Sequence, residues 1–504
     1  METISRETKF KLNTISSLLL QFTTVVCGFI LPRLILASFG STINGLVSSI
    51  SQFLSIIALL EMGVGAVMQS SLYKPLSEKD KDKTSAIMTS GQRYFRTIAI
   101  ILLFYVILLC FFYPAIVEDG DFDNDFIVIL VLVLSFSSFV QYYFGIVDNI
   151  LLAADQKGYI VYFSTIVTII VNTVACSAFI NLGASITFVK ASTAIIFFIR
   201  PVVIRLYINK HYDINRRYKY DEEPIKQKWN GLAQHIASVI LNDTDTIVLT
   251  TFSTLENVSV YGVYNMIVVG VKQLIISLQN AILPVLGELL AKKRTDEATS
   301  FFSIVEFGLH AIVVFLFSCT SVLIIPFVSI YTTGVNDANY INVPFAALIV
   351  MAHAFHCLRM PYNIMVLAAG KYRETQNNYI IAAILNICIS VALVFPLGLL
   401  GVAIGTLVSM LYQTIWLAVF NSKNIIYWPI KKFLKQCIFD IISCLLIVII
   451  SRFITLNTLT YLSWVVMSIK VLIVSIVVMC ITTFLFYQEN ARQIYKYIKH
   501  RMKK

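Results

Sequence analysis

The stretch "STIVTIIVNTVACSAFINLGASITFVKASTAIIFFIR", Ser164 to Arg200, belongs to two long apolar runs, 159–181 and 184–208, separated by the short turn "NLGA". Each run is long enough to cross a bilayer as a helix, because about 20 apolar residues span its ~30 Å hydrocarbon core. Neither run alternates polar and apolar residues as the strands of a membrane barrel do. The stretch therefore predicts a pair of transmembrane helices.

The whole chain has the composition of this stretch. Of its 504 residues 58% are hydrophobic and 13% are charged, and the mean hydropathy is +0.80, whereas soluble domains are about 45–50% apolar and about 25% charged. These values predict an all-α integral membrane protein. We expect fourteen spans, at 13–37, 43–70, 97–117, 126–153, 159–181, 184–208, 231–252, 259–288, 301–325, 341–369, 378–396, 401–420, 434–452 and 463–487.

Basic residues indicate the orientation of these spans. The two tails and every second loop hold 33 of the 39 Lys and Arg residues, while intervening loops such as "NLGA" and "EDGDFDND" hold none. The positive-inside rule therefore places both termini in the cytoplasm. This topology accounts for the net charge of +11 without a nucleic-acid partner. The loops are short and none houses an active site, so we expect no enzyme.

An internal repeat divides the chain. "LLAADQKGY" at Leu151 matches "VLAAGKYRE" at Val366, and "VNTVACSAFINLGAS" at Val171 matches "LNICISVALVFPLGLLG" at Leu385, both at offsets of about 215 residues. Repeats separated by an even number of spans share one topology. We predict a six-helix lobe at 1–208, a cytoplasmic linker at 209–230, a second six-helix lobe at 231–422, and two extra helices with a basic tail at 423–504.

Four basic residues lie inside the spans of the two lobes: Arg33, Lys190, Lys272 and Arg359. Ionisable residues within a membrane are functional candidates, although pairing with acids to hold helices together is an alternative. Asn265, Lys272 and Gln279 recur every seven residues and share one helix face. The residues His353, His356, Arg359 and Asn363 fall within an arc of about 120°. Pro361 beside Arg359 and Pro32 beside Arg33 each predict an interrupted helix.

The acids inside the spans fall into two groups. Asp148 and Asp440 lie near predicted cytoplasmic ends, where water is close, and we expect a structural role for them. Glu61, Asp243 and Asp245 lie deeper and are candidate coupling or gating acids. Residues two apart on a helix differ by about 200°, so only one aspartate of "LNDTDTIVL" faces a given cavity. We assign coupling to Asp245 and helix packing to Asp243; hydrogen bonding of both to neighbouring helices is the alternative.

Two stretches resemble a known family. "FGSTINGLVSSISQFLSIIALLEMGVGAVM" and "DTIVLTTFSTLENVSVYGVYNMIVVGVKQLIISLQNAILPVLGELL" are similar to the bacterial polysaccharide transporter family of Wzx-type O-antigen flippases, within the MATE-like exporter superfamily. The resemblance implies a V-shaped pair of six-helix lobes plus two helices, in the bacterial inner membrane. It also implies a lipid-linked oligosaccharide substrate on an undecaprenyl diphosphate carrier, held in a cationic cavity.

The resemblance leaves three functions open. An undecaprenyl-diphosphate oligosaccharide flippase requires paired cations for the diphosphate, and four are present. A multidrug or cation antiporter of the same fold is the second, and a membrane glycan polymerase is the third. For the flippase we expect a monomer without metal or cofactor, with H+ or Na+ as a possible coupling ion. A polymerase and glycosyltransferases of the same pathway are its expected partners.

Overall fold

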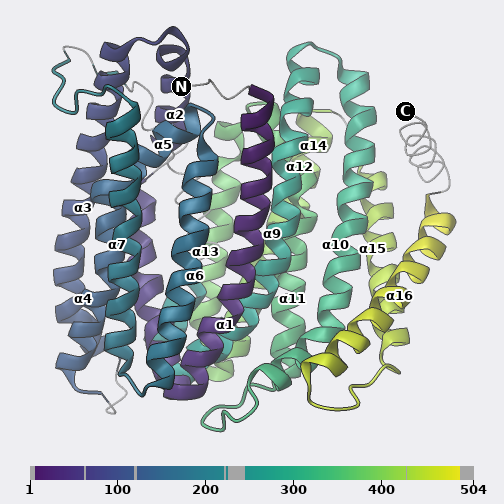
Figure 1. Cartoon of the computed structure of the whole chain (residues 1–504). Coiled ribbons are helices and arrows are strands. Elements are labelled where there is room, and N and C mark those ends of the chain that lie inside the picture. The colour runs from purple at the N-terminus through teal and green to yellow at the C-terminus, as the bar shows by residue number, and fades with distance from the viewer. Residues whose placement is uncertain are drawn as a thin grey trace. The chain divides into compact units, whose positions relative to one another are not determined.

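The computed structural model of the chain describes residues 6–61, 64–117, 122–220, 223–224, 244–426 and 428–487. Within these ranges every regular element is helical, and twelve helices are long and apolar enough to cross a membrane (Figure 1). The predicted all-helical, multi-pass class is confirmed. The two further predicted spans are accounted for separately. The span at 13–37 and the first part of 43–70 lie in one continuous helical stretch, Lys11–Leu60, and most of 231–252 lies outside the described residues.

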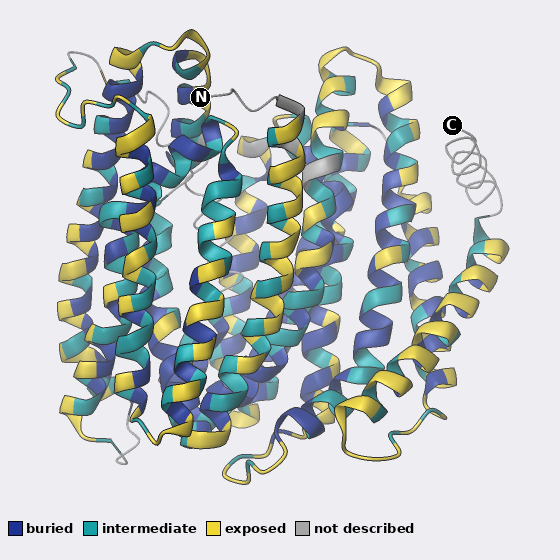
Figure 2. Ribbon diagram, viewed as in Figure 1, coloured by how far each residue is buried: buried dark blue, intermediate teal, exposed yellow. Residues whose placement is uncertain are grey.

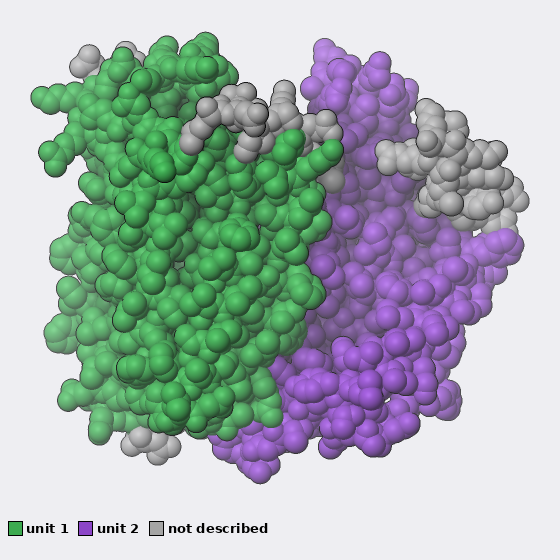
Figure 3. Space-filling model, in the orientation of Figure 1, with its two compact units in different colours: residues 1–239, 254–259 green, residues 240–253, 260–504 purple. Residues whose placement is uncertain are grey.

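The chain divides into two compact units, coloured in Figure 3. Unit 1 comprises residues 1–239 and 254–259, and unit 2 comprises 240–253 and 260–504. Each unit is described by itself below. The predicted division at 209–230 stays a prediction.

Unit 1 is built from long helices that pack side by side. Its elements are α1 (Arg6–Ser55), η1 (Ile56–Leu60), α2 (Val64–Glu78), α3 (Lys81–Ile116), α4 (Asn124–Val140), η2 (Gln141–Gly145), α5 (Ile146–Ala154), α6 (Gly158–Asn181) and α7 (Ile186–His211). Helix α1 packs on α6, and α7 packs on α4 and α6. Helices α2 and α3 occupy nearly all of 71–96, the gap between two predicted spans, because charged side chains extend helices beyond the apolar run that hydropathy detects.

The break in α1 lies at Gly40. This glycine has φ 81° and ψ 177°, a left-handed φ that residues with a Cβ rarely adopt, and it separates the first two predicted spans. Pro32 lies inside the continuous helix, so its predicted interruption is wrong. A proline removes one backbone donor, and a membrane helix tolerates that loss when neighbouring groups satisfy the freed carbonyl.

Unit 2 contains the remaining helices. They are α9 (Leu255–Ala291), whose first residues belong to unit 1, followed by α10 (Thr295–Tyr331), α11 (Val343–Leu358), α12 (Met360–Ala368), α13 (Tyr372–Leu397), α14 (Leu399–Asn424), α15 (Ile430–Ser451) and α16 (Tyr461–Phe486). A helical segment at 244–252 precedes them. Helix α14 packs on α11 and α13, and α10 packs on α11, α15 and α16.

Glycine permits the close approach of α13 and α14. A Cβ added to Gly405 would lie 2.2 Å from Ser390 Oγ, and one added to Gly401 would lie 2.2 Å from the Leu393 carbonyl oxygen. Small residues at such interfaces let helix backbones pack closely where lipid removes the hydrophobic drive for association. Gly401 and Gly405, which carry no side chain, therefore allow α14 to pack closely on α13.

Many large apolar side chains are exposed, and exposed positions recur along the helices in Figure 2. Phe111 and Phe112 of α3 are 76% and 63% exposed, and Leu462 of α16 is 76% exposed. Exposed apolar area on this scale marks a surface that contacts membrane lipid. The buried positions include many polar groups, and some of these form the candidate site.

Candidate functional site

The site is organised around a helix break in unit 2. Helix α11 ends at Leu358, α12 begins at Met360, and Arg359 lies between them. Pro361, the second residue of α12, has no amide hydrogen to donate to the preceding turn. The predicted interruption beside Arg359 is confirmed.

Arg359 is buried without a carboxylate partner. Its side chain is 5% exposed, its Nη2 lies 3.3 Å from His356 Nδ1, and its guanidinium lies 5.9 Å from the ring centroid of Tyr379 on α13. No acid in the described ranges forms an ion pair with it. Since an arginine can only donate, His356 Nδ1 accepts this contact and the imidazole is neutral there. The positive charge of the guanidinium is thus not neutralised by an acid of the described ranges.

Lys272 contributes a second buried cation. It lies on α9, is 9% exposed, and is close enough to act electrostatically on His353 and His356 of α11. On the same helix Asn265 and Gln279 are half-buried, as expected for one polar stripe.

The remaining predicted residue of the group, Asn363, lies on α12. Its side-chain oxygen accepts a hydrogen bond from the Tyr379 hydroxyl. The structure therefore brings Lys272, His353 and His356 together, and it links Arg359 to Asn363 through the ring of Tyr379.

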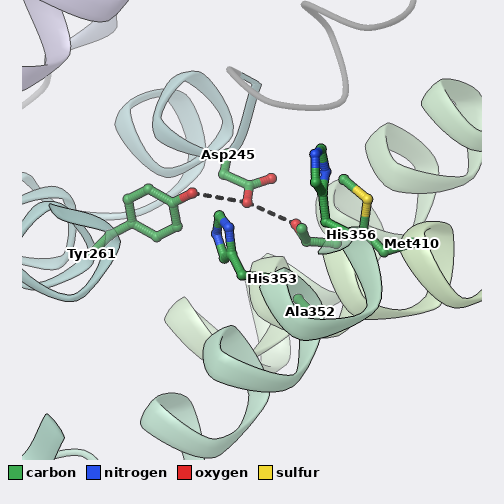
Figure 4. A pocket seen from close by; sticks show the side chains of 7 residues that line it. Asp245, Tyr261, Ala352, His353, His356 and Met410 are labelled. Carbon is green, nitrogen blue, oxygen red and sulfur yellow. Dashed lines mark hydrogen bonds between the residues drawn. The ribbon is translucent and has the colours of Figure 1, made fainter. Parts of the chain in front are cut away.

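Asp245 lies beside the two histidines, in the pocket of Figure 4. The carboxylate is 6% exposed. Its Oδ2 accepts hydrogen bonds from the Tyr261 hydroxyl at 3.0 Å and the Thr406 hydroxyl at 2.7 Å, drawn as dashed lines in Figure 4. Asn386 in turn donates to Thr406 at 3.0 Å.

The pocket next to Asp245 has a volume of about 10 Å³. Such a space holds about one water molecule. Three oxygen-bearing side chains line it, those of Asp245, Tyr261 and Thr406, and one of the three is a carboxylate. These oxygen atoms suit a proton or a small monovalent cation. The pocket is far too small for an organic molecule.

The other predicted residues lie in unit 1 or outside the described residues. Arg33 on α1, Glu61 after η1 and Lys190 on α7 are half-buried. Lys190 forms neither an ion pair nor a hydrogen bond with another described residue. Asp243 falls in the segment that the structure does not describe, so its predicted packing role stays a prediction.

The two acids expected near water are instead buried. Asp148 is fully buried on α5, where Arg205 Nε donates to it at 3.1 Å and Arg216 Nη1 at 2.9 Å. Asp440 on α15 is 6% exposed and lies 2.6 Å from His310 Nδ1. The expectation of hydration is wrong, because the basic partners come from distant segments and replace water. A structural role agrees with these contacts.

Sequence reasoning missed several residues of the site and its surroundings. Tyr379 and Thr406 are neutral, and such residue types are common in spans, so no signal distinguished them. Glu306 and His310 are ionisable and lie four residues apart in the predicted ninth span. The rule that singled out Asp245 would also have found this pair.

The arrangement suits binding and ion exchange rather than bond chemistry. Among the described residues no group of three or more His, Cys, Asp or Glu side chains is placed to hold a metal ion. The buried residues instead offer two cations, two imidazoles and a carboxylate in one unit. Such a set offers hydrogen-bond donors to an anionic group and an acceptor to a small cation.

The fold is similar to that of several solved membrane proteins. A lipid II flippase MurJ in an inward closed conformation is similar over 95% of this chain and 99% of its own, with a TM-score of 0.67 and 16% identity. An inward-facing multidrug resistance MATE family transporter of the MOP superfamily is similar over 80% of this chain and 96% of its own, with a TM-score of 0.59 and 15% identity.

An outward-facing MATE family transporter gives a TM-score of 0.58 at 14% identity, over 84% of this chain and 99% of its own. No protein-family model matches the chain, and no curated protein sequence matches it. These likenesses show a MurJ- and MATE-like fold in a multi-pass membrane protein, and the solved structures that share it are transporters and flippases.

Proposed function

We propose that the protein is a flippase that moves undecaprenyl-diphosphate-linked oligosaccharides across the bacterial cytoplasmic membrane for the synthesis of O-antigen, capsule or exopolysaccharide. One observation carries this proposal: Arg359 is buried at a helix break and faces a neutral imidazole and an aromatic ring instead of an acid. A buried guanidinium without a carboxylate retains the two-pronged donor geometry that binds phosphate oxygens.

The electrostatic argument favours an anionic substrate. A charge inside a membrane protein is costly unless it is paired, and a carboxylate would satisfy Arg359 permanently. A diphosphate satisfies it only while bound, so each transport cycle separates the two charges again. Lys272 adds a second positive charge in the same unit, and we also assign Arg33 and Lys190 of unit 1 to substrate binding.

The neutral polar residues around Arg359 suit the rest of the head group. Asn265, Gln279, His353, His356 and Asn363 present amides and imidazoles that donate to sugar hydroxyls or phosphate oxygens. We assign them to substrate binding, and the alternation between two accessible states releases the substrate on the other face.

Arg359→Ala tests the proposal directly. In proteoliposomes loaded with a lipid-linked oligosaccharide, its loss removes charge-assisted contacts of about 1.5–3 kcal/mol. Affinity for undecaprenyl diphosphate should fall about 10- to 150-fold. The matched control is Arg452→Ala, which removes an exposed arginine at the end of α15. Equal transport by the two variants would exclude Arg359 from the site.

A combined variant tests the wider set of cations. Ala at Arg33, Lys272 and Arg359 together is expected to abolish glycan export in cells while the protein still reaches the membrane at normal levels. Intact export by this triple variant would refute the cationic cavity, whereas loss of protein would be scored separately by immunoblot.

Asp245 is the proposed coupling acid, with H+ or Na+ as the coupling ion. Its buried carboxylate, the hydroxyls of Tyr261 and Thr406 and the water-sized pocket support this assignment. Asp245→Asn keeps the shape of the side chain and removes its charge. We expect transport in this variant to lose its dependence on the pH or sodium gradient. The matched comparison is Asp243→Asn: a larger defect there, or unchanged ion dependence in both, would refute the assignment.

A cation antiporter is the second candidate, because an acid next to an aromatic ring is also a typical cation site. Proteoliposomes decide between the two functions. Uptake of an organic cation driven by a pH gradient, without binding of undecaprenyl diphosphate, would favour the antiporter. The pocket of about 10 Å³ beside Asp245 is too small for an organic cation, which argues against binding of such a cation at this acid.

The proposed topology places both termini and residues 209–230 in the cytoplasm. Reporter fusions after Asp121 and after Tyr220 should read outside and inside, respectively, and the same result at both positions would refute the orientation. We further propose that the protein acts as a monomer together with a polymerase and glycosyltransferases of the same pathway.

A further inference from the structure

A second group of buried ionisable residues lies in unit 2, apart from the Arg359 site. Glu306 and His310 of α10 and Asp440 of α15 are 4%, 1% and 6% exposed. His310 Nδ1 contacts Asp440 Oδ2 at 2.6 Å, and Gln436 donates to the other oxygen of Asp440 at 3.0 Å. Asp440 thus contacts the imidazole directly and Glu306 is near enough to act on it electrostatically, and no lysine or arginine in the described ranges forms an ion pair with either acid.

Glu306 is held by neutral donors alone. The Tyr362 hydroxyl donates to its Oε1 at 2.7 Å and Trp428 Nε1 donates to the same oxygen at 3.2 Å. Neither bond involves Oε2, so this second oxygen can carry a proton while Oε1 continues to accept. The charged and the neutral forms of Glu306 are therefore both compatible with the same contacts.

A cleft connects Glu306 to the exterior. It has a volume of about 410 Å³ and is lined by Glu306, Trp428, Lys432, Lys435, Gln436 and Tyr487 among others. Lys432 and Lys435 are exposed and lie over the rings of Trp428 and Tyr487 at 3.8 and 4.6 Å. A proton from the water that surrounds these exposed lysines can reach the carboxylate through the cleft.

Tyr487 lies beside the inner end of this cleft. Burial raises the pKa of its phenol, and the nearby charges of Glu306 and Asp440 raise it further. The hydroxyl therefore stays protonated and donates to Gln436 Oε1 at 2.6 Å. Tyr487 positions Gln436 and through it Asp440, and it does not itself exchange the proton.

The same group touches the helix break at Arg359. Tyr362 lies three residues after Arg359, in the first turn of α12. His310 packs edge-on against the Tyr362 ring at 6.0 Å and interacts with the backbone of Leu358, the last residue of α11. A change in the charge of Glu306 alters the strength of its bond from Tyr362, because a hydrogen bond to a carboxylate is stronger than one to a carboxylic acid.

We propose that Glu306 is a proton-binding site, reached through this cleft, and that its protonation loosens the attachment of α12 to α10 through Tyr362. The step is the addition of one proton from water to Oε2 of the carboxylate. The groups that face Glu306 are His310 on α10, Tyr362 on α12, Cys437, Asp440, Lys432 and Lys435 on α15, and Tyr487 beyond α16. This proposal does not depend on the substrate of the protein.

The indole of Trp428 is a built-in probe, because it donates directly to Glu306. The chain has four tryptophans, so replacing Trp229, Trp416 and Trp464 by Phe leaves Trp428 as the sole emitter. In the full-length protein in detergent we expect the Trp428 emission to change reversibly, with a midpoint between about pH 5 and pH 9, the range reached by buried carboxylates. A constant emission over this range would overturn the proposal.

Substitutions at Glu306 identify the responding group. Glu306→Gln should abolish the transition, and a transition retained in this variant would assign the response to another residue and overturn the proposal. Glu306→Asp should move the midpoint without abolishing the transition; an unmoved midpoint would also refute it. This second variant keeps the test decisive if Glu306→Gln does not fold. In His310→Gln the transition should persist at a shifted midpoint, because the neighbouring charge is lost.

Hydrogen exchange tests the attachment of α12. At a pH above the midpoint, Glu306→Gln imitates the protonated form, and amides of 360–368 should exchange at least threefold faster than in the wild type. The control is Glu297→Gln, an exposed acid in the first turn of α10. Equal exchange in the two variants would refute the link through Tyr362. Both readouts are independent of transport, so a failure of the proposed flippase function leaves them unaffected.

Discussion

Asp148→Asn should destabilise unit 1 more than any exposed substitution of the same kind. The carboxylate is fully buried and accepts hydrogen bonds from Arg205 and Arg216 at 3.1 and 2.9 Å. Arg205 lies on α7 and Arg216 lies beyond its end, so Asp148 ties α5 to both. Asparagine keeps the volume and one acceptor oxygen but removes the charge that both guanidiniums share.

The magnitude follows from burial. Removing one partner of a buried ion pair costs about 3–5 kcal/mol. The side chains of Arg205 and Arg216 are 22% and 19% exposed, so water partly solvates the orphaned guanidiniums and the lower end of this range applies. A loss of about 3 kcal/mol corresponds to about 6–12 °C in the melting temperature of a unit of 245 residues.

The assay is thermal unfolding of the purified protein followed by intrinsic fluorescence. Asp213→Asn is the matched control, since its ion pair with Lys81 is 79% and 68% exposed on the two side chains and exposed pairs contribute little. We expect a shift within about 2 °C for this control. If Asp148→Asn melts within the same margin as Asp213→Asn, the reasoning from buried charge is refuted.

Two further substitutions have clear expected outcomes. Gly405→Ala places a Cβ 2.2 Å from Ser390 Oγ and should lower stability by about 1–3 kcal/mol. The control is Gly270→Ala, which has no atom within 4 Å of the new Cβ and should be neutral or slightly stabilising in the same melts. Equal losses of stability in the two variants would contradict the close packing of α13 on α14. Asp80 caps α3, and the hydrogen bond that its carboxylate accepts from the Lys83 amide lowers the pKa of Asp80 from 3.8, so charge at Asp80 stabilises the fold above about pH 4. The melting difference between wild type and Asp80→Asn should vanish as the pH falls below 3.8, and a difference that persists in acid would show that the charge is not responsible.

The sequence by itself determined the class of protein and the positions of most of its helices. Hydropathy is a local property, because each span is defined by its own ~20 residues whatever they pack against. The contact between Arg359 and His356 was also foreseeable, since the two are three residues apart on one helix. The break at Arg359 followed from the adjacent Pro361 in the same way.

The same local signal, a proline beside an arginine, breaks the helix at one position and leaves it continuous at another. Pro32 stands beside Arg33 as Pro361 stands beside Arg359, yet α1 continues through Pro32 and breaks at Gly40. A proline only removes one donor and crowds the preceding turn. Whether the helix continues depends on the groups that neighbouring helices supply to the freed carbonyl, and these come from other parts of the chain.

Tertiary structure alone decided the partners of the buried polar groups. Thr406 is 161 residues from Asp245, and Asp440 is 130 residues from His310. Periodicity shows which face of a helix a side chain occupies, but not which helix that face meets. In a chain of apolar helices many neighbours are nearly equivalent in hydropathy. The choice among them is made by close packing at residues such as Gly401 and Gly405 and by the need of each buried charge for a partner.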